Sequence, residues 1–294
     1  MNLVQTLANR NLISPPKWLP NSVMYLTIMG SEAYGVSSND SDRDVYGFCV
    51  PPREVVFPHL TGEILGFGKQ VKRFSQWQEH HIHYQDDDAG KGRDYDLTVY
   101  SIVKYFQLCM DNNPNMIDSL FTPPRCHLTI TQVGQMVYEN RRLFLHKGCW
   151  HKFKGYAYAQ LHKMDNKNPV GKRKELVEEF GYDVKFAYHL VRLLLEVEQI
   201  LAEGDLDLER PREQLKAIRR GEWTEGQIRG FFHQKETELE KLYNDSTLPW
   251  TADEGPIKEL LLECLNICYG EVTLKQPGRF EKAVREIQEI VGRI

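Results

Sequence analysis

Two aspartates that stand two residues apart carry the first chemical signal in this chain of 294 residues. Asp42 and Asp44 lie in DRDVYGFCV (42–50), whose alternating pattern, closed by Pro51 and Pro52, predicts a β-strand. Side chains two apart on a strand leave the same face, so these carboxylates repel each other unless a cation lies between them. Mg²⁺ takes carboxylate oxygens and keeps phosphate oxygens in its shell. The pair therefore predicts a divalent-metal site that meets a phosphate.

Other interpretations of this segment are weaker. Asp40, Asp42 and Asp44 match the opening of an EF-hand calcium loop, but Val45 stands where that loop needs Gly and Pro51 where it needs Glu. A solvated strand edge is the usual role of an isolated Asp-x-Asp, and only the neighbouring residues argue against it.

Gly30 and Ser31 are those neighbours, and they end the apolar, strand-like run 22–29 (SVMYLTIM). At a strand-to-helix turn they offer backbone N–H groups and a hydroxyl to an anion, and glycine lets a phosphate approach the backbone closely. A phosphate cradle and a carboxylate pair within 15 residues of each other are what nucleotidyl transfer requires.

The elements that must position these residues change class along the chain. Residues 62–72 predict a strand or hairpin arm, residues 78–94 an exposed loop, and residues 96–100 (DLTVY) a strand. Ser101 then predicts the cap of a helix, whose apolar positions are Ile102, Tyr105, Phe106, Cys109 and Met110.

From about residue 130 the pattern is helical. The clearest helix is expected at 181–204, with others at 224–244, 255–269 and 278–294. We therefore expect an α+β fold with two domains, a catalytic domain over 1–130 and a helical domain over 131–294 that completes a nucleotide and acceptor cleft.

The segments GSEAYGVSSNDSDRDVYGFCVPP, DLTVYSIVKYFQLCMDNNPNMIDSLF and FGYDVKFAYHLVRLLLEVEQIL carry a family resemblance. The first resembles the signature of the DNA polymerase β nucleotidyltransferase superfamily. All three together resemble the RNA repair pathway DNA polymerase β family, also called YcgL-like predicted nucleotidyltransferases. The resemblance implies a polymerase-β-type domain followed by helices and a two-metal nucleotidyltransferase that uses two Mg²⁺ ions, with Mn²⁺ as a substitute.

A third carboxylate is also implied by the resemblance. Asp96 is the first candidate, with Asp94 and the Asp86–Asp88 run as alternatives. In that scheme Asp42 and Asp44 hold both ions, and Asp96 shares the ion nearer the attacking oxygen and receives the proton of the acceptor hydroxyl.

A second constellation lies in the helix expected at 181–204. Lys185, His189 and Arg192 stand at i, i+4 and i+7 and share one face away from the apolar stripe, so they need not be buried. They are candidates to bind the phosphates of the nucleotide together with Gly30 and Ser31. A solvated face with Asp183 or Glu196 as partner is the alternative.

Basic residues concentrate in the same half of the chain. The whole chain has 37 Lys and Arg against 41 Asp and Glu, but the segment 141–192 has 12 basic and 5 acidic residues. Lys163, Lys172 and Arg173, in an expected loop, are weaker candidates to bind an acceptor nucleic acid. Aromatic residues that interleave with lysines suggest a stacking surface, although such aromatics more often form core; these residues are Lys152, Phe153, Lys154, Tyr156 and Tyr158.

Several other classes find no support in the sequence. His80, His81 and His83 lack a fourth ligand at zinc spacing. P-loop, Gly-x-Ser-x-Gly and His-Glu-x-x-His motifs are absent. No apolar run is long enough to span a membrane, and no signal peptide is recognised. Six scattered cysteines predict reduced core residues of a cytoplasmic protein.

We expect a nucleotidyltransferase that moves an NMP from an NTP, ATP among them, to an acceptor hydroxyl. An RNA or tRNA 3′ end is the first choice of acceptor, in repair or tailing. Nucleotidylation of a protein or small molecule is the alternative within enzymes, and a catalytically silent nucleotide- or RNA-binding module is the alternative outside them.

Overall fold

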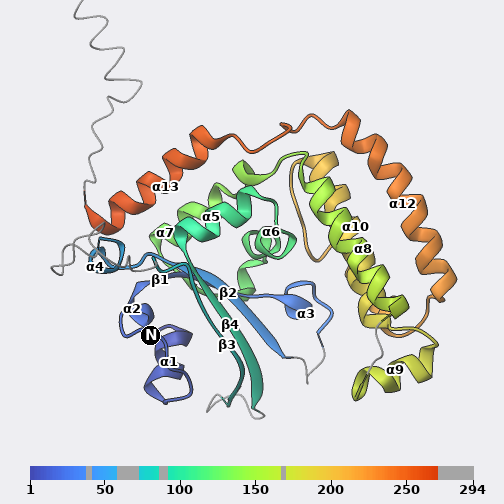
Figure 1. Ribbon diagram of the computed structural model, residues 1–294, viewed down its shortest axis with the longest axis horizontal. Coiled ribbons are helices and arrows are strands. Elements are labelled where there is room, and N and C mark those ends of the chain that lie inside the picture. The colour runs from blue at the N-terminus through green and yellow to red at the C-terminus, as the bar shows by residue number, and fades with distance from the viewer. Residues whose placement is uncertain (38–41, 58–72, 86–91, 167–169, 271–294) are drawn as a thin grey trace, which may run out of the picture.

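The computed structural model describes residues 1–37, 42–57, 73–85, 92–166 and 170–270 (Figure 1). The strand expected at 62–72, the Asp86–Asp88 run and the helix expected at 278–294 lie outside the described residues.

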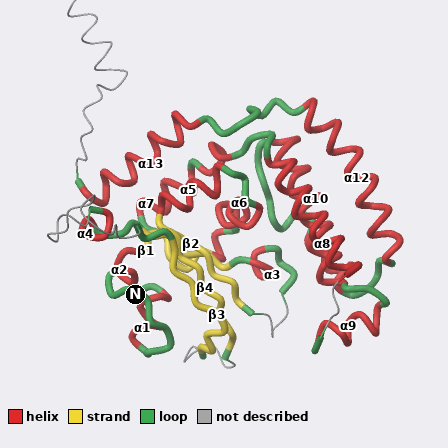
Figure 2. Tube along the Cα trace, in the orientation of Figure 1, coloured by secondary structure: helices red, strands yellow, loops and turns green. Residues whose placement is uncertain are grey.

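A mixed sheet of five described strands forms the first part of the chain (Figure 2). The strands follow the spatial order β3-β4-β2-β1-β5, with β2 and β4 parallel and the other neighbours antiparallel. Their bounds are β1 Val23–Ile28, β2 Arg43–Cys49, β3 Gln76–Tyr84, β4 Arg93–Ser101 and β5 His127–Ile130. With the helices around it, this sheet confirms the α+β fold.

Strand β3 corrects one expectation from the sequence, because most of it falls in the stretch expected to be an exposed loop. Among the described strands it lies at the edge of the sheet and pairs with β4 alone, and of its nine residues only Ile82 and Tyr84 are buried. An edge strand with one solvated face needs few apolar residues, so its sequence lacks the usual pattern. A bulge between Glu79 and Ile82 breaks the alternation further, and His81 adopts a φ of +57° there.

Every described element after β5 is helical. The α-helices are α1 Leu3–Asn9, α2 Leu19–Ser22, α3 Gly30–Ala33, α4 Arg53–Val56, α5 Ile102–Met110, α6 Pro114–Phe121, α7 Gln132–Glu139, α8 Cys149–Asn166, α9 Lys172–Phe180, α10 Val184–Glu203, α11 Arg212–Arg219, α12 Glu225–Asp245 and α13 Glu254–Tyr269. Short 3-10 turns cover Pro124–Cys126 and Arg141–Phe144. Among these helices, none in the described ranges has both the length and the apolar character of a membrane span.

Capping chemistry matches the predicted start of α5 and the predicted end of α10, whereas α10 begins at Val184 and not at the expected residue 181. The Ser101 hydroxyl accepts the Lys104 N–H at 3.2 Å at the start of α5. The Asp183 carboxylate accepts two N–H groups at the start of α10, and Gly204 ends that helix with a φ of +64°. Lys163 and Arg173, by contrast, lie in helices α8 and α9 and not in a loop. The end of α8 and the start of α9 are rich in polar and charged residues, so their sequence resembles that of a loop.

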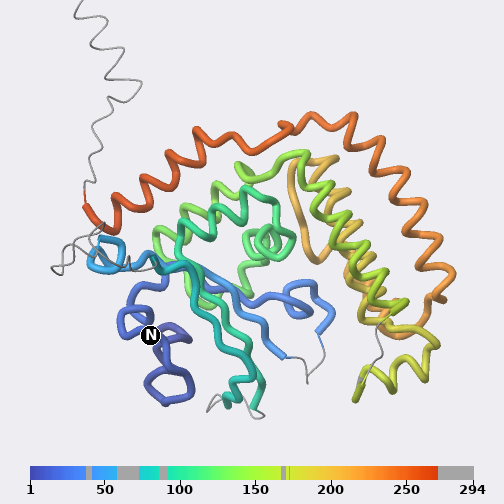
Figure 3. The backbone as a smooth tube through the Cα atoms, viewed as in Figure 1, coloured from blue at the N-terminus to red at the C-terminus, as the bar shows by residue number. Residues whose placement is uncertain are grey.

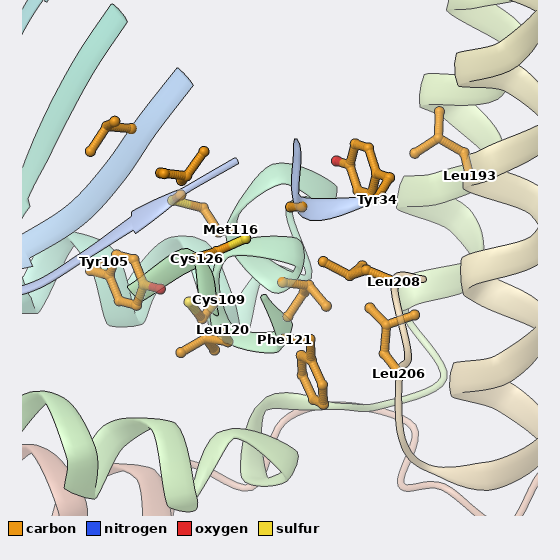
Figure 4. Close-up of a cluster of buried hydrophobic side chains, with 14 of the residues drawn as sticks. Tyr34, Tyr105, Cys109, Met116, Leu120, Phe121, Cys126, Leu193, Leu206 and Leu208 are labelled. Carbon is orange, nitrogen blue, oxygen red and sulfur yellow. The ribbon is translucent and has the colours of Figure 1, made fainter. Parts of the chain in front are cut away.

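Helices cover the sheet and continue beside it as a bundle of α8, α10 and α12 (Figure 1). Helix α3 lies between the sheet and the bundle (Figure 1). The chain then returns across the sheet side through α13 (Figure 3), where the Tyr269 hydroxyl donates to the Pro51 carbonyl. One continuous core links the parts, and Figure 4 shows Tyr34 beside Leu193, Leu206 and Leu208 at the junction. Five of the six cysteines are buried, as expected of core residues, whereas Cys268 is half-buried.

Candidate active site

The carboxylates meet at one edge of the sheet because of strand direction. Strands β2 and β4 run parallel and in register, and Asp44 is the direct partner of Asp96. Paired residues of neighbouring strands point to the same face. Asp42 precedes β2 and is exposed. The three carboxylates that the sequence singled out therefore gather at the beginning of two adjacent strands.

Gly30 reaches the same edge because β1 runs antiparallel to β2. Ile28 pairs with Val45, and the Met29 N–H donates to the Asp44 carbonyl at 2.7 Å. Gly30 has a φ of +66°, and a Cβ added there would lie 2.7 Å from Asp44 Oδ2. Only glycine satisfies both the backbone conformation and the space. Ser31 follows in α3, half-buried, and its carbonyl accepts the Val36 N–H.

Burial and the neighbouring carboxylates both disfavour the ionised form of Asp44. Burial raises the pKa of Asp44, and the Asp96 and Asp42 carboxylates raise it further, while Lys185 and His80 oppose the shift. Like charges held together in this way are stabilised by a cation. Oxygen donors suit a hard divalent ion.

Within the described ranges, no three His, Cys, Asp or Glu side chains stand close enough to surround one ion. Mg²⁺ does not require such a group, because one or two carboxylates and the phosphates of a substrate normally complete its shell. The donor set of Asp44 and Asp96, with Asp42 beside it, fits that pattern.

Strand β3 adds contacts to Asp96 from His80 and His81, which were considered from the sequence only as zinc ligands. The His81 backbone N–H donates to Asp96 Oδ1 at 2.8 Å, and His80 Nδ1 lies 3.5 Å from the same oxygen. The bulge in β3 brings both contacts to Asp96, and no local signal in the sequence marks a bulge here. Asp94, the alternative third carboxylate, instead lies 2.9 Å from His83 Nδ1 and half its side chain is exposed.

A cleft of about 750 Å³ opens beside Asp44. Gly30 and Asp44 line one side, and helices α8, α9 and α10 supply the other. Basic side chains dominate the helical side, namely Lys152, Lys163, Arg173 and Lys185. The Asp44 carboxylate thus faces several basic groups across a space that accommodates a nucleotide.

A model of the RNA repair pathway DNA polymerase beta family matches residues 4–245. This match spans the sheet, the cleft and helices α8 to α12. The chain belongs to the RNA repair pathway DNA polymerase beta family. Polymerase-β-type nucleotidyltransferases transfer nucleotidyl groups, so membership indicates a transferase of that kind.

The other comparisons add little to this assignment. No curated protein matches the chain. One similar solved structure is the nucleotidyltransferase-like protein from Exiguobacterium sibiricum 255-15, with 11% sequence identity, coverage of 99% of this chain and 87% of that chain, and a TM-score of 0.28. At this TM-score we draw no argument from it.

In this family member, the face of α10 that the sequence singled out is only partly free. Lys185, His189 and Arg192 all line the cleft, as their spacing predicts. Lys185 is exposed and has no acidic partner among the described residues. The nearby Arg173 guanidinium pairs with Asp183 at 2.7 Å and stacks on the Phe186 ring, 3.8 Å from its centre.

His189 is a neutral side chain in a basic setting. Burial lowers the pKa of His189 well below its ordinary value, and the cations Arg192, Lys185, Arg173 and Arg219 lower it further. At neutral pH the imidazole is therefore a hydrogen-bonding group without charge, and an anion bound in the cleft would favour its protonation.

Arg192 differs from the expectation that this face need not be buried. It is 4% exposed, and its Nη1 donates to Asp118, to both carboxylate oxygens of Glu196, and to the Tyr34 hydroxyl at 2.8 Å. Tyr34 in turn donates to Asp118 at 2.7 Å. The network forms because Asp118 and Glu196 are themselves fully buried and need a cation. It ties the turn after Gly30 to α6 and α10.

Proposed function

We propose that the protein transfers an NMP from an NTP to an acceptor hydroxyl in a Mg²⁺-dependent reaction, with an RNA 3′ end as acceptor. The observation that carries this proposal is the cleft itself, in which Asp44, the strand partner of Asp96, faces a helical wall that includes the cation Lys185. A polyanionic triphosphate fits the basic wall, and a metal-binding group fits the acidic edge. Family membership supports the RNA acceptor.

Asp42, Asp44 and Asp96 would hold the divalent ions. A bound divalent ion supplies Lewis acidity toward the reacting phosphate and acceptor oxygens. Burial raises the pKa of Asp44 most, and the neighbouring carboxylates of Asp96 and Asp42 raise it further. A bound cation would offset the repulsion between these carboxylates.

The protein's own groups position the reactants. Gly30 lets the phosphates approach the backbone beside Asp44, and Lys185 pairs with their charge. Ser31 and His189 are proposed to donate hydrogen bonds to the same phosphates. Arg192 was grouped with them by spacing, but its Nη1 already serves Asp118 and Glu196; we assign it the positioning of the turn after Gly30.

Proton transfer is assigned to Asp96. Its Oδ1 accepts the His81 N–H, which leaves Oδ2 for the proton of the attacking hydroxyl, directly or through water. The acceptor oxygen forms a bond to the α-phosphorus, the bond from the α-phosphorus to the bridging oxygen breaks, and pyrophosphate leaves.

The test is a labelling assay with Mg²⁺, each α-³²P NTP in turn and total tRNA. We expect label on RNA, and a loss of on the order of 1,000-fold in Asp44→Asn and Asp96→Asn. Asp96→Asn keeps an oxygen for the His81 N–H and removes one negative charge from the cluster, so its thermal stability should not fall.

Asp94→Asn is the matched control, because it removes a carboxylate two residues away that pairs with His83. It should retain activity. Equal loss in Asp94→Asn and Asp96→Asn would overturn the assignment of the third carboxylate. Label on protein in place of RNA would replace the proposed acceptor, and label nowhere with an intact NTP affinity would favour a silent binding module.

A further inference from the structure

Helix α8 presents two faces of similar composition with different surroundings. On the side toward α12, Lys154 pairs with Glu236 at 2.9 Å, and Tyr158 donates to Glu236 at 2.6 Å and packs on Phe232. On the side toward the cleft, Lys152 and Tyr156 line open space. The lysines and tyrosines that interleave along α8 thus form two groups. Lys154 and Tyr158 contact α12, whereas Lys152 and Tyr156, the available half, remain at the cleft.

The available half has the groups that a nucleotide requires. Lys152 is exposed and has no acidic partner in the part of the chain that the structure describes. The Tyr156 side chain is at the cleft surface, 38% exposed, and its hydroxyl accepts Asn113 Nδ2 at 3.1 Å. Tyr46 and Asn115 line the same cleft. Aromatic faces, amides and a lysine recognise a base and a phosphate.

Tyr46 connects this group to the catalytic edge. It stands two residues after Asp44 on β2, on the same face. Tyr46, Tyr156 and Asp44 all line the one cleft, so this aromatic surface lies beside the proposed catalytic edge.

The cleft has a second basic end. Lys163 Nζ lies 5.8 Å from the centre of the Phe186 ring, so the end of α8 meets the start of α10, where Lys185 lies. Lys152 and Lys163 are 11 residues apart on one helix, roughly 16 Å along its axis. That distance exceeds what one triphosphate occupies.

Reaction geometry decides what each end holds. In-line displacement places the attacking oxygen and the leaving pyrophosphate on opposite sides of the α-phosphorus. Lys163 and Arg173 both lie against the Phe186 ring, next to Lys185, and all three line the cleft. The triphosphate carries more charge than the end of an RNA, so we place it at this cationic end. The acceptor must then enter from the end with Lys152 and Tyr156.

We propose that the end of the cleft formed by Lys152, Tyr156 and Tyr46 binds the terminal nucleotide of a single-stranded RNA acceptor. Its base stacks on Tyr156, and its phosphate contacts Lys152. This inference rests on the proposed function and specifies where the acceptor of that reaction lies.

Two affinities measured on the full chain test it. One is that of a short 5′-fluorescein-labelled single-stranded RNA, by anisotropy, and the other is that of Mg-ATP, by equilibrium dialysis. Tyr156→Ala should weaken RNA binding about tenfold or more, and Tyr156→Phe should retain it. Lys152→Ala should weaken it about fivefold and reduce the salt dependence by one phosphate contact. ATP affinity should change less than twofold in each.

Lys154→Ala and Tyr158→Phe are the matched controls on the opposite face, and neither should change RNA binding. Weaker ATP binding with unchanged RNA binding in Tyr156→Ala would overturn the proposal, because Tyr156 would then serve the NTP, and the proposed reaction would stand. Equal effects of Lys152→Ala and Lys154→Ala would overturn it as well. RNA binding that depends on Tyr156 in a protein without transferase activity would support the subsite and refute the proposed reaction.

Discussion

Replacing Gly30 with alanine tests the proposed active site through its most constrained position. Gly30 combines a φ of +66° with a would-be Cβ 2.7 Å from Asp44 Oδ2. An alanine in the left-handed region costs about 1–2 kcal/mol. The added contact is a separate effect, because restoring an ordinary separation of about 3.4 Å requires a shift of roughly 0.7 Å between the new methyl group and the carboxylate.

The two effects can be separated by a second glycine. Gly204 ends α10 with a φ of +64°, and a Cβ there meets only Leu248 at 3.5 Å, an ordinary van der Waals distance. Gly204→Ala therefore pays a similar backbone cost without touching the carboxylates. Both variants should lose thermal stability, and Gly30→Ala should lose at least as much as Gly204→Ala because of its added contact.

Activity should distinguish them. A displacement of this size at a reacting group costs roughly 10- to 100-fold in rate, so Gly30→Ala should lose that factor in kcat/KM for NTP while Gly204→Ala stays within about threefold of the parent. The assay is transfer from α-³²P NTP under subsaturating NTP, with thermal unfolding measured in parallel. Equal kcat/KM in the two variants would refute the close approach of Gly30 to Asp44 as a catalytic requirement.

Three further predictions concern α10. Arg192→Met should destabilise the fold by about 3–5 kcal/mol in denaturant unfolding, because it leaves Asp118 and Glu196 buried without a cation. Lys185→Met, at an exposed position, should change stability by less than about 0.5 kcal/mol but raise the KM for NTP about tenfold. Burial lowers the pKa of His189 below 6.5, so below that pH the unfolded state binds a proton that the folded state does not. The free energy of unfolding should therefore fall as pH drops below about 6.5, by up to about 1.4 kcal/mol per pH unit. His189→Gln should reduce this fall, as measured by urea titrations at pH 7 and pH 5.

The strands and helices that carry the candidate site were predictable because their signals are local. Alternation over DRDVYGFCV marks β2, and the apolar stripe with a glycine at its end marks α10. Strand β3 was not predictable in the same way. It is an edge strand with two buried residues and a bulge, and its pairing with β4 supplies the order that its own sequence does not encode.

The types of the site residues also came from the sequence, whereas their surroundings did not. Asp42, Asp44, Gly30 and Lys185 were identified by type and spacing. Spacing could not show that Arg192, on the same helix face as Lys185, is buried against Asp118, because that carboxylate comes from another element 74 residues away.

Helix α8 gives the clearest case of this division. Its sequence, in the region expected to be mainly helical, has lysines and tyrosines two residues apart, Lys152 and Lys154, Tyr156 and Tyr158. Helical periodicity places the members of each pair on different faces. Only the packing of α12 against one face determines which lysine and which tyrosine are used in ion pairs and core, and which remain at the cleft. Local sequence fixes what each side chain can do, and contacts between distant elements determine which of them are free to do it.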